Sequence, residues 1–271
     1  MGVEILSARK AGGADADLET HLDRVTVRSV DDIRAAAEFL NHFALAHGLR
    51  AALCADVADK NPMRDASGEV LAEAVFGWSA EGDRWWTKQC QGLNSPLARA
   101  CRYESEPFWG NREGFHLAIS NHYLDNIDIR RYFSVSPVSQ SAIIVPVHLP
   151  FAQVSANSFH PIDRSIDDLS QTYARIGGIL GAITRRFTSG YVSATRTKRR
   201  LPSGCVLSKR EVECLRWAAI GKTDQEIATI IGLSHAAVRY HLHGAGEKLN
   251  SINRAQSVFK AGQLGFLGPS G

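Results

Sequence analysis

The sequence lacks the cysteine patterns that bind zinc or form redox pairs. Its five cysteines are odd in number, the two nearest in sequence are Cys205 and Cys214, and no CxxC pair occurs. Neither a zinc knuckle nor a dithiol redox centre is therefore indicated. Free thiols are typical of a reducing compartment, so we expect a cytoplasmic protein without structural disulfides.

Long apolar runs and enzyme motifs are also missing. No stretch approaches the roughly eighteen consecutive apolar residues of a membrane-spanning helix, and residues 1–19 contain no apolar run followed by a cleavage site, so no signal peptide is expected. His148, His160, Asp163 and Cys101 are scattered, and no nucleophile elbow, phosphate loop or metal pattern accompanies them. We therefore predict no enzyme, no catalytic residues, no metal and no bound cofactor.

The charge, which is mild overall at +3, is unevenly distributed. Residues 1–184 contain 17 Lys and Arg against 23 Asp and Glu, whereas residues 185–271 contain 14 against 5. An acidic first part and a basic second part indicate that the second part binds a polyanion. A solvated basic surface without a partner is the alternative.

The pattern of apolar residues predicts two domains joined by a linker. Residues 1–28 are polar and predict a flexible tail, and residues 188–205 are polar and basic, as in an interdomain linker. Between them, residues 29–187 predict a mixed α/β domain. Its expected strands are 50–58, 69–78, 141–150 and 152–159, and its expected helices are 31–47, 83–104 with a break at Pro96, and 166–187.

Residues 206–271 predict four short helices. Three capping boxes mark helix starts, at Ser208 with Glu211, Thr223 with Glu226, and Asn253 with Gln256, and Ser234 is a good N-cap. Glycines at 221, 232 and 265 stand where helices should end. The expected inward side chains are Val212, Leu215, Ala218 and Ala219 in the first helix, Ile227, Ala228 and Ile231 in the second, Val238, Leu242, Ala245 and Leu249 in the third, and Ala255, Val258, Phe259 and Gly262 in the fourth.

The second and third helices are separated only by Gly232 and Leu233, which predicts a helix-turn-helix whose second helix lies in the DNA major groove. The third helix would then present His235, Ala236, Arg239, Tyr240 and His243 outward. Its histidines do not have zinc spacing, because His235 and His243 lie roughly 12 Å apart along the axis. His241 and His243 point to different sides, and His241 is expected to be half-buried.

These features resemble the C-terminal DNA-binding domain of LuxR-type transcription factors. The resemblance is continuous over about sixty residues, and its Trp217-Ala, Gly221-Lys222, Lys248-Leu249 and Asn253-Arg254 elements are most similar to the quorum-sensing branch. It implies a homodimer, with the fourth helix in the interface, that binds a two-fold site on double-stranded DNA, and RNA polymerase is a candidate partner. The expected DNA contacts are Lys222, Thr223, Ser234, His235, Arg239, His243, Lys248 and Arg254.

The resemblance implies an autoinducer-binding-like sensor over residues 29–187. The fold class is then α+β, with an N-terminal α/β/α sandwich and a C-terminal all-α, four-helix helix-turn-helix domain. Segments around Trp85-Trp86, Ser95-Pro96 and Pro107-Phe108-Trp109 are similar to the family's pocket segment. The expected ligand-binding residues are Trp85, Trp86, Ser95 and Trp109.

The sensor also departs from the family. Ser95 or Asn94 stands where the family has an aspartate that accepts a hydrogen bond from the signal's amide, and a charge-assisted bond is thereby lost. The aromatic residues could equally form an apolar core. Four alternatives remain: an acyl-homoserine lactone as signal, another small molecule, a "solo" regulator without a ligand, or a protein that forms heterodimers with another LuxR-type regulator through residues 166–187. A phosphorylated receiver domain is not indicated, because Asp31-Asp32 precede a helix.

Overall fold

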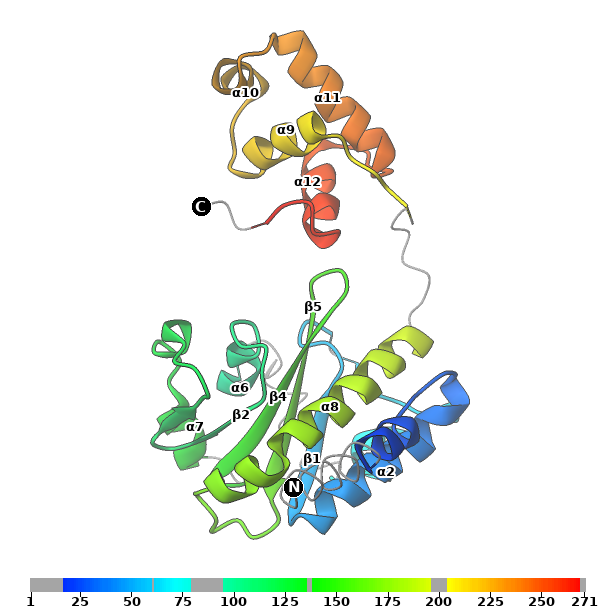
Figure 1. Cartoon of the computed structure of the whole chain (residues 1–271), viewed down its shortest axis with the longest axis vertical. Coiled ribbons are helices and arrows are strands. Elements are labelled where there is room, and N and C mark those ends of the chain that lie inside the picture. The colour runs from blue at the N-terminus through cyan, green and yellow to red at the C-terminus, as the bar shows by residue number, and fades with distance from the viewer. Residues whose placement is uncertain (1–16, 60, 79–94, 136–137, 196–203, 269–271) are drawn as a thin grey trace, which may run out of the picture. The chain divides into compact units, whose positions relative to one another are not determined.

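A computed structural model describes residues 17–59, 61–78, 95–135, 138–195 and 204–268. The chain divides into two compact units whose boundary in the sequence falls between residues 196 and 197. The first unit contains a sheet flanked by helices, and the second is helical (Figure 1). None of the helices in the described ranges combines the length and the apolar character that crossing a membrane requires.

The first unit is built on an antiparallel sheet of five strands in the order β1-β5-β4-β2-β3. Two of its strands, β4 and β5, form a long central hairpin in which Ile143 lies opposite Phe159. The strands are β1 (Leu49–Cys54), β2 (Phe108–Asn111), β3 (Gly114–His116), β4 (Ser141–Leu149) and β5 (Gln153–Pro161).

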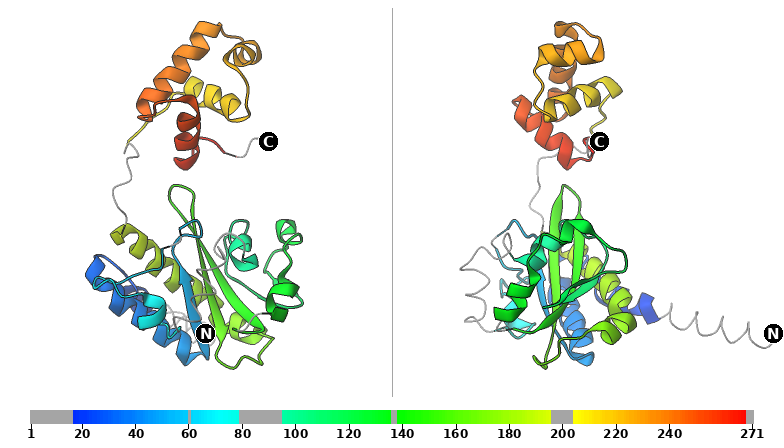
Figure 2. Two further views of the ribbon diagram at one scale, coloured as in Figure 1. Left: turned by 180° about the vertical axis from the view of Figure 1, so that it is seen from behind. Right: turned by 90° about the vertical axis from the view of Figure 1, so that its left-hand side faces the viewer.

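Helices cover both faces of this sheet (Figure 1). The larger α2 (Ile33–Ala46) and α8 (Ser170–Thr195) lie on one face, and α6 (Pro96–Ala100) and α7 (Ile129–Val135) lie on the other (Figure 2). Because successive strand residues point to opposite faces, neighbours in β4 enter different cores. Ile143 and Val145 belong to the first core cluster, beside α2 and α8, whereas Ala142 and Ile144 belong to the second, beside α6 and α7. The α/β/α sandwich is confirmed.

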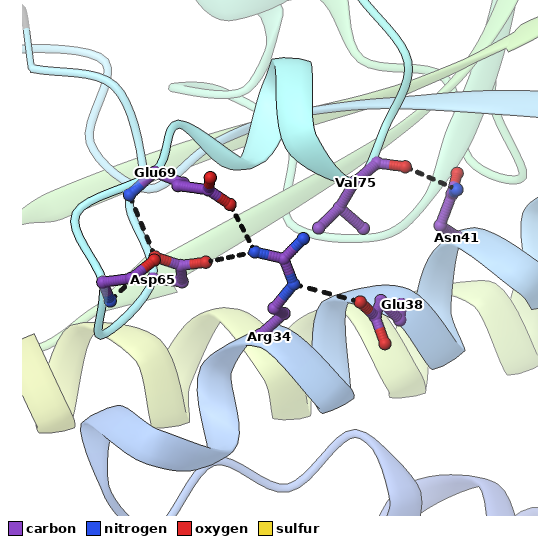
Figure 3. A network of polar contacts seen from close by, with 7 residues as sticks. Arg34, Glu38, Asn41, Asp65, Glu69 and Val75 are labelled. Carbon is purple, nitrogen blue, oxygen red and sulfur yellow. Dashed lines mark hydrogen bonds and ion pairs between the residues drawn. The ribbon is translucent and has the colours of Figure 1, made fainter.

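The loop between β1 and the short α3 (Leu71–Ala74) is fastened to α2 by polar contacts (Figure 3). Arg34 of α2 donates hydrogen bonds to Glu38, Asp65 and Glu69. The nearly buried Asp65 also accepts bonds from Ser67 and from the Glu69 backbone N–H. Hydrogen bonding, led by that from the Ser67 hydroxyl, holds the pKa of Asp65 below its usual value despite burial. The loop is thus held against α2.

Two segments predicted to be flexible are partly ordered. Residues 17–24 are helical, and Val25 and Val27 are buried in the first core cluster, so the predicted tail of residues 1–28 is wrong over its second half. The α8 helix continues past the predicted end at 187 as far as Thr195, because Tyr191 and Val192 still face the core. Residues 188–195 were predicted to belong to the linker because most of them are polar or small.

Other elements also differ from prediction. Residues 69–78 form no strand: Val70 makes an isolated bridge to Arg64, and the chain then turns into α3, whose Ala and Glu residues favour a helix. In the predicted helix 83–104, residues 83–94 lie outside the described residues, and Pro96 begins α6 instead of breaking a helix. The hairpin of β2 and β3 and the α7 helix were not predicted, because their apolar runs are short.

The second unit contains four helices in the described residues, as predicted (Figure 2). Each one begins within one or two residues of its expected cap. The helices are α9 (Lys209–Ala219), α10 (Asp224–Ile231), α11 (His235–Lys248) and α12 (Arg254–Gln263).

Candidate nucleic-acid interface

Hydrogen-bonded caps set the starts of the four C-terminal helices. The two capping boxes at Ser208 with Glu211 and at Thr223 with Glu226 are both complete, and the Ser234 hydroxyl accepts from the Ala237 N–H. At α12 the Asn253 side chain caps the helix as expected, but Gln256 returns its bond to the N–H of Ile252 rather than Asn253. Each cap satisfies a backbone donor that a helix start leaves free.

A left-handed glycine joins α10 to α11. Gly232 has φ +67°, and the following Leu233 donates its N–H back to the Ala228 carbonyl. A glycine adopts this conformation without the strain that a side chain would cause. The two helices therefore meet at a short turn, which confirms the predicted helix-turn-helix.

Two small cores, both against α9, fix the rotation of α11. Val238 packs with Cys214, Ile227 and Ala228, and Ala245 packs with residues of α9 and α12. With these residues inward, the opposite face is fully accessible. This exposed face of α11 comprises His235, Ala236, Arg239, Tyr240 and His243, and His241 is half-buried as predicted.

The predicted DNA contacts on the exposed face of α11 have few competing partners. In the described part of the chain Arg239 and His235 form no ion pair, and His243 lies 3.6 Å from Glu247. Lys222, just before α10, lies 3.4 Å from Glu226, and the two side chains are 40% and 49% exposed. Such exposed pairs contribute less than about 1 kcal/mol and exchange readily for a phosphate. Ser234 and Thr223 occupy cap positions at the starts of α11 and α10.

Lys248 and Arg254 instead connect helices to one another. The Lys248 ammonium lies 2.8 Å from the buried Glu211 carboxylate, which ties α11 to the start of α9. Burial opposes ionisation of Glu211, but Lys248 and Ser208 outweigh it and hold its pKa below the usual value. Arg254 of α12 donates to the Asp224 carboxylate and to the Lys222 carbonyl. Sequence analysis did not identify Glu211 and Asp224 as partners, because the residues they pair with are 37 and 30 positions away.

The two glycines in α11 lie where neighbouring groups approach the helix. A methyl group at Gly244 would lie 3.1 Å from a Glu211 carboxylate oxygen, and one at Gly246 would lie 3.5 Å from the hydroxyls of Ser251 and Ser257. The Gly246 carbonyl also accepts from the backbone N–H and the hydroxyl of Ser251. The distance at Gly244 is tight, so this glycine makes room for the Glu211 carboxylate, whereas the distance at Gly246 is an ordinary van der Waals contact that an alanine would also allow.

The predicted inner face of α12 is wrong except at Val258, which packs against both small cores. Ser257 and Ala261 are the buried residues, Val258 is half-buried, and the other predicted residues, Ala255, Phe259 and Gly262, are exposed. Ser257 is accepted in the core because it bonds to Ser251 and to the Asn253 carbonyl. Similarly, Ala219 of α9 is exposed and Cys214 takes its place in the core. Phe259 is 64% exposed, so α12 presents an unpaired apolar face.

The predicted ligand residues of the first unit are not gathered in one place by the described residues. Trp85 and Trp86 lie outside the described residues. Trp109 is 8% exposed and packs in the first core cluster, with its ring stacked on His116 at 3.8 Å. Ser95 is buried at the start of α6, whose following residues enter the second core cluster, on the opposite face of the sheet. Trp109 is thus a core residue.

Comparison with known proteins identifies a family that matches the C-terminal unit and relatives whose alignments are longer than that unit. Residues 205–261 match the model of the family described as bacterial regulatory proteins, luxR family. The transcriptional activator protein VanR of Vibrio anguillarum is 33% identical over 125 residues, 46% of this chain and 51% of that protein. The transcriptional activator protein AhyR of Aeromonas hydrophila is 27% identical over 177 residues, 65% of each.

The solved structure of Escherichia coli SdiA is similar to this chain with a TM-score of 0.48 and 16% sequence identity, covering 93% of this chain and 98% of SdiA. The alignments with VanR and AhyR span between half and two thirds of those proteins' lengths. The family that matches residues 205–261 comprises regulatory proteins, not enzymes.

Proposed function

We propose that this chain is a transcriptional regulator of the LuxR type, since residues 205–261 match that family, and that it regulates promoters by binding, as a dimer, a DNA site with two-fold symmetry. The observation that supports this most directly is the exposed face of α11, which presents Arg239 with no ion-pair partner in the described part of the chain. In this geometry α11 lies in the major groove, where an arginine is suited to bidentate contacts with guanine. Bacterial DNA lies in the cytoplasm, so the protein acts there.

The proposed DNA surface has two parts. Arg239, His235 and His243 face the base edges, while Lys222, Thr223 and Ser234 contact phosphates beside the helix starts. Lys248 and Arg254 support this surface from behind. Lys248 orients α11 through Glu211, and Arg254 orients the start of α10 through Asp224. DNA contact by either residue would require an existing ion pair to open.

The apolar face of α12 is the proposed dimer contact. Ala255, Phe259 and Gly262 are exposed on one side of this helix, which follows α11 closely in the chain. A two-fold contact through the helix would place two copies of α11 side by side, as two half-sites one helical turn apart require. RNA polymerase bound at the neighbouring promoter is the proposed partner of the complex.

The test is a binding measurement on a site selected by the full chain from random double-stranded DNA. Arg239→Ala should weaken binding to the selected site by about 1–3 kcal/mol and relax the preference at one base pair. Arg185→Ala, which removes an exposed arginine of α8, is the matched control and should leave affinity unchanged. Equal affinity of both variants for the selected site would contradict base contact by Arg239.

Control of the first unit by a small molecule is the second part of the proposal. The sensor resembles that of receptors for acylated lactones, but Ser95 supplies no carboxylate for the signal's amide. A thermal-shift screen tests this, because a bound ligand stabilises the folded state in proportion to the logarithm of its concentration over its Kd. If acyl-homoserine lactones and other small molecules all leave the melting temperature unchanged, regulation is independent of ligand or proceeds through heterodimers with another LuxR-type protein.

A further inference from the structure

Arg50, at the start of β1, is a half-buried cation. In the described part of the chain its guanidinium forms neither an ion pair nor a hydrogen bond, and it lies 5.2 Å from the centroid of the Trp78 ring. Trp78 is held in place because its indole N–H donates to the Ala51 carbonyl at 2.7 Å. The aromatic face attracts the guanidinium but leaves its donors unpaired.

A buried histidine lies directly across the strand pair. Arg50 on β1 is opposite His160 on β5, and residues opposite one another in an antiparallel pair point to the same face. His160 is 4% exposed, and its ring lies edge-on to Trp78 with centroids 6.1 Å apart. Arg50, Trp78 and His160 therefore form one cluster at this end of the sheet.

The hydrogen bonds of His160 leave it neutral. The Ser139 hydroxyl donates to the Ser141 carbonyl at 2.7 Å, so it accepts the 2.8 Å bond from Nδ1–H of His160. The other ring nitrogen, Nε2, is then free to accept from the Ser158 hydroxyl at 2.9 Å. Burial lowers the pKa of His160 to about 4, in agreement with this arrangement. The neutral histidine therefore adds no charge beside Arg50, and both of its ring nitrogens are already hydrogen-bonded.

The same face of the two strands continues into apolar surface. Side chains two and four positions apart share a face, so Cys54 of β1 and Ala156 of β5 follow Arg50 and His160 toward the second core cluster. The sheet thus places the Arg50 cation on the same face as apolar residues of the second core cluster, while Trp78, which lies beside Arg50, also packs against the first core cluster. This combination suits a molecule with one charged end and an apolar body.

We propose that the Arg50 guanidinium, positioned over the Trp78 ring, binds the carboxylate of a small organic acid. The guanidinium fork matches a carboxylate with two parallel hydrogen bonds. A phosphate group with its higher charge is matched less well by one arginine. The proposal rests on the small-molecule part of the proposed function and specifies an anionic ligand in place of a neutral lactone.

The experiment compares three molecules that share one acyl chain: decanoate, methyl decanoate and N-decanoyl-homoserine lactone. Binding to the full chain is measured by calorimetry, and binding to the selected DNA is measured in parallel. Decanoate should bind at least tenfold more tightly than either neutral molecule. Tighter binding of the lactone, or no binding of decanoate, overturns the carboxylate assignment. Unchanged DNA binding in that case shows that the regulator assignment stands independently.

Variants test the role of Arg50. Arg50→Gln should lose at least tenfold in decanoate affinity, and Arg50→Lys, which keeps the charge but not the fork, should lose less. Arg24→Gln is the matched control, because Arg24 also lies over an aromatic ring, at 4.8 Å from Phe39, without a buried histidine in that contact. Thermal unfolding without ligand verifies that all variants fold. Equal decanoate affinity of Arg50→Gln and the unmodified chain overturns the proposal.

Discussion

His160 shows how a single buried side chain makes the stability of the first unit depend on pH. The folded protein keeps the imidazole neutral between two serine hydroxyls, and burial lowers its pKa to about 4. In the unfolded chain the pKa returns to about 6.5. Between these values the unfolded state binds more protons, so stability is fully present above about pH 6.5 and is lost as the pH falls toward 4.

His160→Gln tests this dependence. From about pH 7.5 to 5 the unmodified chain should lose about 2 kcal/mol of unfolding free energy through this group, whereas His160→Gln, which cannot titrate, should lose clearly less. Chemical denaturation at several pH values in that range measures both. The same slope in both proteins would show that His160 does not titrate as described.

The α8 helix contains glycines of two different kinds. A methyl group at Gly190 would lie 2.7 Å from the Val27 backbone carbonyl, so this position allows the N-terminal segment to approach the helix closely. At the exposed Gly178 nothing lies within 4 Å of such a methyl group. Gly190 therefore has a packing role, whereas Gly178 only lowers the intrinsic stability of the helix.

Two alanine substitutions in α8 should have opposite signs. Gly190→Ala should destabilise the protein by about 1–3 kcal/mol, because backbone has to move to make room. Gly178→Ala should stabilise it by about 0.5–1 kcal/mol, since alanine is the better helix former. Denaturant unfolding of the two variants checks this, and a stabilised Gly190→Ala would mean that the Val27 segment is not packed on α8.

For the whole molecule, the proposed activity requires two copies of the basic C-terminal unit on one DNA site. Residues 185–271 contain 14 Lys and Arg against 5 Asp and Glu, which favours DNA at low salt irrespective of sequence. Selectivity for a two-fold site needs, in addition, a defined spacing of two α11 helices. The apolar face of α12, with Phe259 64% exposed, is the surface from which we derive that spacing.

Phe259→Glu should weaken the dimer and the affinity for a two-fold site at least tenfold, about 1.4 kcal/mol, while leaving affinity for a single half-site unchanged. Ile119→Glu, at a position of the first unit that is 82% exposed, is the control for adding an exposed charge. Sedimentation equilibrium and DNA titration measure the two effects. Dimers of undiminished stability in Phe259→Glu would exclude α12 as the contact.

Local sequence patterns predicted the structure correctly where it depends on residues that are close together in the chain. The caps at Ser208, Thr223 and Ser234 and the turn at Gly232 depend on groups within a few residues of one another, so the helix-turn-helix and the exposed face of α11 were predictable. The apolar run at residues 141–150 and the neighbouring segment 152–159 likewise predicted β4 and β5, most of whose residues are buried. These features need no knowledge of distant contacts.

Contacts between residues that are far apart in the chain could be known only from the tertiary structure. Lys248 and Arg254 carry the charge expected of DNA contacts, but carboxylates on other helices bind them. The inner face of α12 was mispredicted because two serine hydroxyls satisfy each other in the core, which makes Ser257 a better buried residue there than Phe259. Arg50 and His160 are 110 residues apart and meet only because β1 pairs with β5. The sequence alone determined the secondary structure of the DNA-binding unit, and the packing determined which of its charges, and which arginine of the sensor, remain free to bind a partner.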